Sequence, residues 1–343
     1  MKRNFETMSA PLHMLLAAVL TAFLFYLSNT TLPLLSLFMV FPFVTLYVTE
    51  GLGWLLGAAA LSGGIIALAM GMMGFTDPMM GVDLALGVIP QTALMAAAMG
   101  ELIRRKRPTF EEFVIPALVF TAASAAYLFM NAALQDGGFM GRVQDVVNAV
   151  IDELTNRMRE EGFMNAQIVE YEVFTRSLAR TMITLTPSFF FTEGVIAAIM
   201  SSSLSRWFLH NTVSEDIAPL RFESFYVTRS VATGLVLSTV VTLLLGSWLA
   251  PLQAIGLNLL SGGLLVFFIH GMARVQESLK RHGMGLALRI LVGLVIVVFL
   301  VPTLFVTFYG IYKGLQIKEA PAMAPTEASS EAADEHGPSE DAE

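Results

Sequence analysis

The sequence predicts an all-α, polytopic transmembrane bundle of about nine helices, with a helical hairpin outside the membrane. Apolar residues make up 55% of the 343-residue chain and charged residues only 14%, whereas soluble domains carry roughly a quarter of charged residues. Several apolar stretches reach the ~20 residues that a helix needs to cross the hydrocarbon core. Lys and Arg gather on the same side of nearly all of these stretches, which is the bias that orients membrane helices.

The predicted spans follow one another with short connections, except between the fifth and the sixth. They cover residues 10–28, 32–49, 52–73, 82–103, 112–134, 183–208, 229–249, 254–276 and 285–313. The second span contains Pro33 and Pro42, which predict a kink or a break there, since neighbours must satisfy the carbonyls that proline frees. No cleavage site follows the first span, so we expect a retained helix rather than a signal peptide.

The basic residues of the short loops orient these spans. If nine spans cross the membrane in alternating directions, most basic residues lie on one face. They are Lys2, Arg3, the run Arg104–Arg107, then Arg206, Arg221 and Arg229, and finally Arg274, Lys280, Arg281 and Arg289. Loops 74–81 and 251–253, on the other face, contain no Lys or Arg. We therefore expect a bacterial cytoplasmic membrane protein with its N-terminus in the cytoplasm and its C-terminus outside. Lys313 and Lys318 do not agree with an outside C-terminus, because basic residues favour the cytoplasmic side.

The chain divides into four predicted segments. Residues 1–134 form a five-helix membrane segment, 135–182 an extramembrane amphipathic helical hairpin, 183–318 a four-helix membrane segment, and 319–343 an acidic tail. The tail contains no Lys or Arg, and its composition is typical of disordered segments.

The hairpin is predicted from helical periodicity. Val143, Val146, Val147, Val150 and Leu154 fall on one face of its first helix, and Gly162 separates the two helices. The hairpin has three interpretations: a long structured loop, a lid over a binding cavity, or an element that docks a partner.

Ionisable and strongly polar side chains inside a membrane are costly, so they are the candidates for a substrate-binding site. Glu193 lies well inside the sixth span, where its carboxylate must pair, reach water or stay protonated. Asn258, His270, Gln91 and Asn131 are further candidates within spans. For these four, a hydrogen bond between helices is the alternative interpretation.

Small residues spaced four positions apart let helix backbones approach closely in lipid. Ala18 with Ala22, and Gly53 with Gly57, have this spacing. They are candidates for helix docking, either within the bundle or onto a separate membrane subunit.

Several classes of function lack their sequence signatures. The chain has no Cys, which excludes disulfides and Cys-based metal sites. It contains no G-x-x-x-x-G-K-[ST] phosphate loop, no H-E-x-x-H and no G-x-S-x-G. We therefore expect neither an enzyme nor a cofactor or metal, and no nucleic acid partner.

The C-terminal part carries a family resemblance. It reads Ala-Ile-Gly-Leu-Asn-Leu-Leu over 254–260, Val-Phe-Phe-Ile-His-Gly-Met-Ala over 266–273, Lys-Arg-His-Gly over 280–283, and it ends its last apolar span with Phe-Tyr-Gly at 308–310. These elements resemble the bacterial YybS-like family of predicted membrane proteins, with His270 in place of the usual Gln. The resemblance implies a distant similarity to substrate-binding subunits of energy-coupling-factor transporters. In those subunits, a pair of small residues four positions apart on the first helix docks the coupling subunit, and Ala18 and Ala22 match that pair. Such subunits usually have six helices, fewer than the nine predicted here.

Two functions remain open from the sequence. The first is a transporter, or the substrate-binding membrane subunit of one, without its own ATPase; its partners would be the bilayer and a membrane coupling subunit or a second copy of the chain. The alternative is a non-transporting scaffold or regulatory protein that acts through its extramembrane hairpin.

Overall fold

The computed structural model describes residues 9–72, 80–134, 138–213 and 216–317. In this part of the chain every regular element is a helix, which confirms the predicted all-α class. The elements are α2 (Ala10–Thr30), η1 (Pro33–Phe38), α3 (Val40–Glu50), α4 (Leu52–Met72), α5 (Met80–Arg104), α6 (Thr109–Leu134), α7 (Gly138–Glu160), α8 (Asn165–Thr184), α9 (Thr186–Thr212), η2 (Phe222–Ser224), α10 (Arg229–Gly246), α11 (Ala250–Arg281), α12 (Leu286–Val298) and α13 (Leu300–Gln316).

Eight helical stretches of the described residues are long and apolar enough to cross a membrane, and a bent pair of helices makes a ninth if it counts as one span. The predicted polytopic bundle is therefore confirmed. The second span is interrupted as the two prolines predict, because the short 3₁₀ helix η1 precedes α3.

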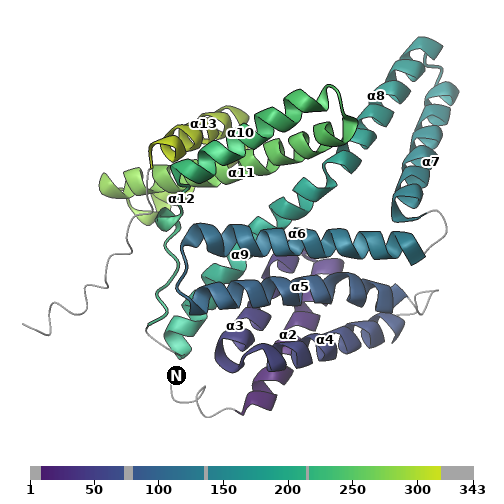
Figure 1. Cartoon of the computed structure of the whole chain (residues 1–343). Helices are drawn as coiled ribbons and strands as arrows, with labels where there is room; N and C mark the ends of the chain where they lie inside the picture. The colour runs from purple at the N-terminus through teal and green to yellow at the C-terminus, as the bar shows by residue number, and fades with distance from the viewer. Residues whose placement is uncertain (1–8, 73–79, 135–137, 214–215, 318–343) are drawn as a thin grey trace, which may run out of the picture.

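The helices form two groups that lie side by side (Figure 1). One group contains α2 to α6 and α9, and the other contains α10 to α13. The segment that precedes α10 joins them, because the ring of Phe225 is fully buried and stacks on Phe113 of α6 with centroids 5.7 Å apart. The hydroxyls of Thr109 and Ser224, 2.6 Å apart, make a second link.

The predicted span 285–313 consists of two helices, α12 and α13, rather than one straight helix. The chain bends by 102° between α12 and α13. Pro302 explains the break, since a proline ring clashes with the carbonyl four residues earlier, and Val298, four residues before it, is where α12 ends. Thr303 then donates its hydroxyl to the carbonyl of Phe299 at 2.9 Å, which satisfies one group at the bend.

The end of α13 returns to the beginning of α10. The backbone N–H of Arg229 donates to the carbonyl of Ile317 at 2.6 Å. In Figure 1, α12 and α13 lie at the end of the bundle where α6 and α10 begin. The bent pair therefore does not lead the described chain to the opposite end of the bundle.

The hairpin between the fifth and sixth spans consists of α7 and α8, which turn at Gly162 with a φ of 83°. Ile151 and Ile168 are buried, with 1% and 2% exposure. Arg176 of α8 donates to Asn148 at 2.6 Å and to Asp152 at 3.1 Å. The hairpin projects away from the bundle, and α8 leads into α9 along one line (Figure 1).

Candidate functional site

A cavity of about 470 Å³ opens at the end of the bundle where α5 begins and α6 ends. We call it the polar cavity. Side chains from α2, η1, α3, α5, α6 and α9 line it. Its polar lining residues are Ser28, Asn29, Ser36, Asp83, Gln91, Thr92, Ser124, Tyr127 and Glu193.

The short helix α3 and the 3₁₀ turn η1 before it form one wall of the polar cavity. An α-helix rises about 1.5 Å per residue, so the 11 residues of α3 cover only about half of the ~30 Å hydrocarbon core. Ser201, within α9, donates to the carbonyl of Leu37 at 2.9 Å, which holds η1 against α9. The second span thus consists of a short helix preceded by a 3₁₀ turn, and Pro33 and Ser36 of that turn line the cavity.

Hydrogen bonds between α5 and α6 fix the polar wall of the cavity. Ser124 donates to the side-chain carbonyl of Gln91 at 2.9 Å, and the hydroxyl of Tyr127 donates to the carbonyl of Asp83 at 3.1 Å. Asn131 donates to the Tyr127 hydroxyl at 3.2 Å. A Cβ at Gly87 would lie 2.9 Å from the Tyr127 ring, so this glycine lets the ring rest on α5.

Glu193 lies on the α9 wall of the polar cavity, and its side chain is exposed. The next residue, Gly194, lies where α9 contacts α6. A Cβ at this position would be 3.0 Å from Ala117 Cα, so glycine allows the close approach of the two helices. Among the described residues, the carboxylate of Glu193 has neither a hydrogen bond nor an ion-pair partner. The sequence left three environments open for this carboxylate: a charged partner, contact with water, or a protonated state. Its exposed position in the open cavity favours contact with water.

The predicted candidates separate into two sets. Glu193 and Gln91 line the polar cavity, and Asn131 supports its wall through Tyr127. Asn258 instead ties α11 to α9, because it donates to the Thr184 carbonyl at 2.8 Å and accepts from the Ser188 hydroxyl at 2.7 Å.

His270 is likewise remote from the cavity. It is fully buried, and its Nδ1 accepts the backbone N–H of Val227 at 3.2 Å. Asn258 therefore makes the bond between helices that was its alternative interpretation, whereas His270 ties α11 to the irregular segment that precedes α10.

The small-residue pairs differ in environment. Ala18 and Ala22 are buried, with 0% and 7% exposure, so they pack inside the chain and present no surface to a separate subunit. A Cβ at Gly57 would lie 2.8 Å from the sulfur of Met14, so Gly57 lets α4 approach α2. Gly53 has open space around it.

Sequence reasoning missed Asp83, Ser124 and Tyr127 as members of the cavity. Asp83 and Gln91 are eight residues apart, and Ser124, Tyr127 and Asn131 recur at i, i+3 and i+7. Both patterns place polar groups on one helix face, and this shared periodicity is the signal that could have found them.

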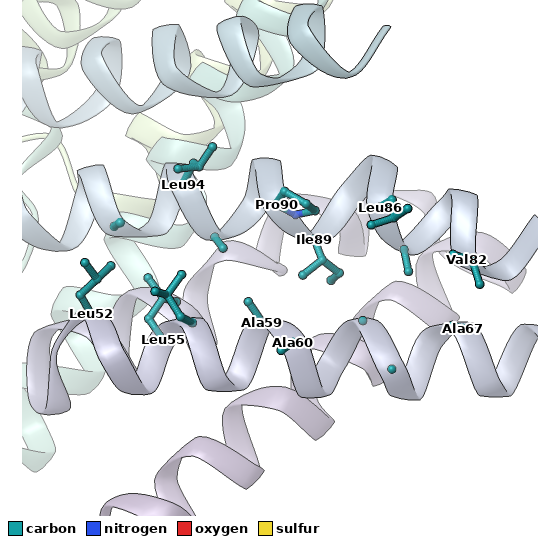
Figure 2. A pocket seen from close by; sticks show the side chains of 16 residues that line it. Leu52, Leu55, Ala59, Ala60, Ala67, Val82, Leu86, Ile89, Pro90 and Leu94 are labelled. Atoms are coloured by element: carbon teal, nitrogen blue, oxygen red, sulfur yellow. The ribbon is translucent and has the colours of Figure 1, made fainter. Parts of the chain in front are cut away.

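A larger cavity of about 620 Å³ lies between α4 and α5 (Figure 2). All of its lining residues are apolar. In Figure 2, Leu52 and Leu55 of α4 point toward α5, while Ile89 points back toward α4. We call it the apolar groove; it offers hydrocarbon contact and no group for chemistry.

Comparisons with known proteins identify the family of the chain. No curated protein and no solved structure matches the chain, and the similarity to energy-coupling-factor subunits stays a prediction. A family model described as "Predicted membrane protein (DUF2232)" matches residues 19–312, which agrees with the YybS-like resemblance. The chain therefore belongs to this family of predicted membrane proteins.

Proposed function

We propose that the chain is a substrate-binding membrane subunit, or a transporter, without an ATPase of its own. The polar cavity carries the proposal. Small-molecule sites are concave, enclose about 300–1,000 Å³, and place a few polar groups among apolar ones; the cavity of about 470 Å³ has this size and lining. A chain without a nucleotide-binding loop would take its energy from an ion gradient or from a separate subunit.

We place the protein in the bacterial cytoplasmic membrane with its basic helix ends toward the cytoplasm. The run from Arg104 to Arg107 lies at the end of α5, whereas Asp83 of the polar cavity lies at its beginning. The Lys/Arg bias thus directs the cavity mouth away from the cytoplasm, where it would capture a solute from outside.

The test is ligand-induced stabilisation of the purified full chain in nanodiscs. A ligand at a hundredfold excess over its Kd stabilises the folded state by about 2.7 kcal/mol, which a melting experiment detects. A library of small metabolites should contain at least one such compound.

Two matched variants connect this stabilisation to the polar cavity. Ser36→Trp fills the cavity and should abolish the stabilisation, while Leu94→Trp fills the apolar groove and should preserve it. If no compound stabilises the protein, or if the two variants respond alike, the proposal fails.

The α7–α8 hairpin favours a second function, a scaffold that docks a partner. Its apolar side chains Val150, Val169, Val173 and Phe174 are between 51% and 65% exposed. Among the side chains that the structure describes, none from α7 or α8 lines the polar cavity, which favours a docking role for the hairpin over a lid. A photocrosslinker at Phe174 should capture a partner in cells if the hairpin docks one, and an empty crosslinking profile would count against this function.

A further inference from the structure

The polar cavity carries only one sign of charge. Its ionisable lining residues are Asp83 on α5, Glu193 on α9 and the phenol of Tyr127, and no Lys, Arg or His of the described residues lines it. A bound anion would meet two carboxylates and no countercharge.

These two carboxylates differ from the others in the membrane helices. Glu50 pairs with His13 at 2.7 Å, Glu101 with Arg105 at 2.6 Å, and Glu112 with Arg206 at 2.5 Å. Neither the Asp83 nor the Glu193 side chain has a hydrogen bond or ion pair within the described parts of the chain. A charge inside a membrane protein is costly unless it is paired or hydrated. The side chains of Asp83 and Glu193 are exposed, so water in the cavity can hydrate them, and both remain available to pair with a cation that enters.

Aromatic rings complete the lining. Phe25, Phe120, Phe190 and Tyr127 border the same space as the carboxylates. Aromatic faces attract cations electrostatically and are used to recognise quaternary ammonium groups. Carboxylates with aromatic rings thus match an ammonium compound better than they match a sugar or a carboxylic acid.

The size and donor set favour an organic cation over a metal ion. The described residues contain no group of three His, Cys, Asp or Glu side chains that could hold a metal. A cavity of about 470 Å³ also exceeds what a single ion fills, and it falls in the size range of sites for organic ligands.

We infer that the polar cavity binds a small organic cation, an amine or ammonium compound whose positive charge is met by Glu193 and Asp83. This inference rests on the proposed function and adds the charge class of the substrate. Gln91 and Asn29 supply amides at the same cavity, which can orient polar groups elsewhere on the ligand.

The experiment is calorimetric titration of the full chain in nanodiscs of zwitterionic lipid with charge-matched probes. Choline is compared with its neutral isostere 3,3-dimethyl-1-butanol, and benzyltrimethylammonium and spermidine are compared with benzoate and glucose. We expect binding of at least one cation and of none of the neutral or anionic probes.

Variants assign the charge requirement to the cavity. Glu193→Gln removes a negative charge that would contact the ligand's positive charge, so it should weaken cation binding by about tenfold, and Asp83→Asn should weaken it in the same direction. Glu170→Gln, at an exposed carboxylate of α8, should leave it unchanged. Both cavity variants remove a charge without breaking a bond within the described chain, so their folding should be intact, and the melting temperature checks this.

The outcomes separate the two claims. Binding of a neutral or anionic probe that Ser36→Trp abolishes would keep the proposed function and overturn the cation inference. Cation binding that is unchanged in Glu193→Gln and Asp83→Asn would overturn it as well. Failure of every probe here and of every compound in the metabolite library would overturn both.

Discussion

Glu112 and Arg206 form a buried ion pair between α6 and α9. Glu112 is fully buried, Arg206 binds both of its oxygens at 2.5 and 2.8 Å, and Ser202 donates its hydroxyl to the same carboxylate. Breaking a buried pair by neutralising one partner costs about 3–5 kcal/mol, because it leaves the other charge uncompensated. Glu112→Gln should therefore lower the unfolding free energy by about that amount, measured by reversible SDS titration in mixed micelles.

Two comparisons make this prediction specific. Glu111→Gln removes the neighbouring carboxylate, which is 3.9 Å from Arg107 and one-third exposed, and should change stability by less than about 1 kcal/mol. The double variant Glu112→Leu with Arg206→Met replaces the pair by apolar side chains and should recover much of the loss. A double variant as unstable as Glu112→Gln would contradict this account.

Individual residues also show how much of the candidate site the sequence could predict. The rarity of polar residues in apolar spans identified Glu193, Gln91 and Asn131, and also Asn258 and His270. It could not separate the cavity residues from the structural ones, because the face that a helix turns to its neighbours is set by packing between helices. Glu112 was missed because its partner Arg206 lies 94 positions away and spacing along the chain carries no sign of it.

At the scale of elements, α13 packs closely on α11. A Cβ at Gly310 would collide with the Phe267 carbonyl, and one at Gly271 with the Val306 carbonyl. Both collisions are with backbone, so no side-chain movement relieves them. Gly310→Leu should therefore separate α13 from α11 and detach the end of α13 from α10.

The chain has no Cys, so a designed pair can measure this contact directly. Cysteines at Arg229 and Ile317, whose backbones are hydrogen-bonded, should crosslink readily, and Gly310→Leu should reduce the yield several-fold. A cysteine at Trp248, beyond the far end of α10, paired with one at Ile317 should not crosslink. Crosslinking of this second pair alone would mean that α12 and α13 together cross the membrane.

The return of α13 also changes the expected side of the C-terminus. The sequence led us to expect a C-terminus outside, because nine full crossings require it. With Ile317 beside Arg229, a reporter fused after Ile317 should lie on the same side as one at the N-terminus, and Lys313 then conforms to the Lys/Arg bias. Alkaline phosphatase activity from the C-terminal fusion, with none from a green fluorescent protein fusion, would support the outside placement instead.

Sequence patterns predicted most of the elements but not this bend. Hydropathy identified the apolar stretch of 285–313, since it reports only that the residues avoid water. It cannot distinguish a crossing helix from a pair that returns, because both are equally apolar. Pro302 was the local sign, and its effect depends on whether Thr303 and neighbouring helices satisfy the freed carbonyls.

At the scale of the whole molecule, the polar cavity and the α7–α8 hairpin are separate parts. The cavity is formed by α2, η1, α3, α5, α6 and α9, whereas the hairpin projects from the end of α6 and returns through α8 (Figure 1). The sequence left open whether the hairpin covers a cavity, since periodicity predicts its helices but not their direction. The structure therefore predicts that ligand binding and partner docking can be removed independently.

Replacing residues 139–182 by a linker tests this independence. A linker of roughly 12 Gly and Ser residues has an end-to-end distance of about 20 Å, enough to join α6 to the first turn of α9. Because none of the described side chains of the deleted segment lines the polar cavity, the shortened chain should keep its cation affinity within about threefold, measured by the same calorimetric titration. It should also lose any partner that Phe174 crosslinks in the full chain. Cooperative melting of the shortened chain would show that the bundle is intact. If such a chain no longer binds the cation, the hairpin does act on the cavity, contrary to this prediction.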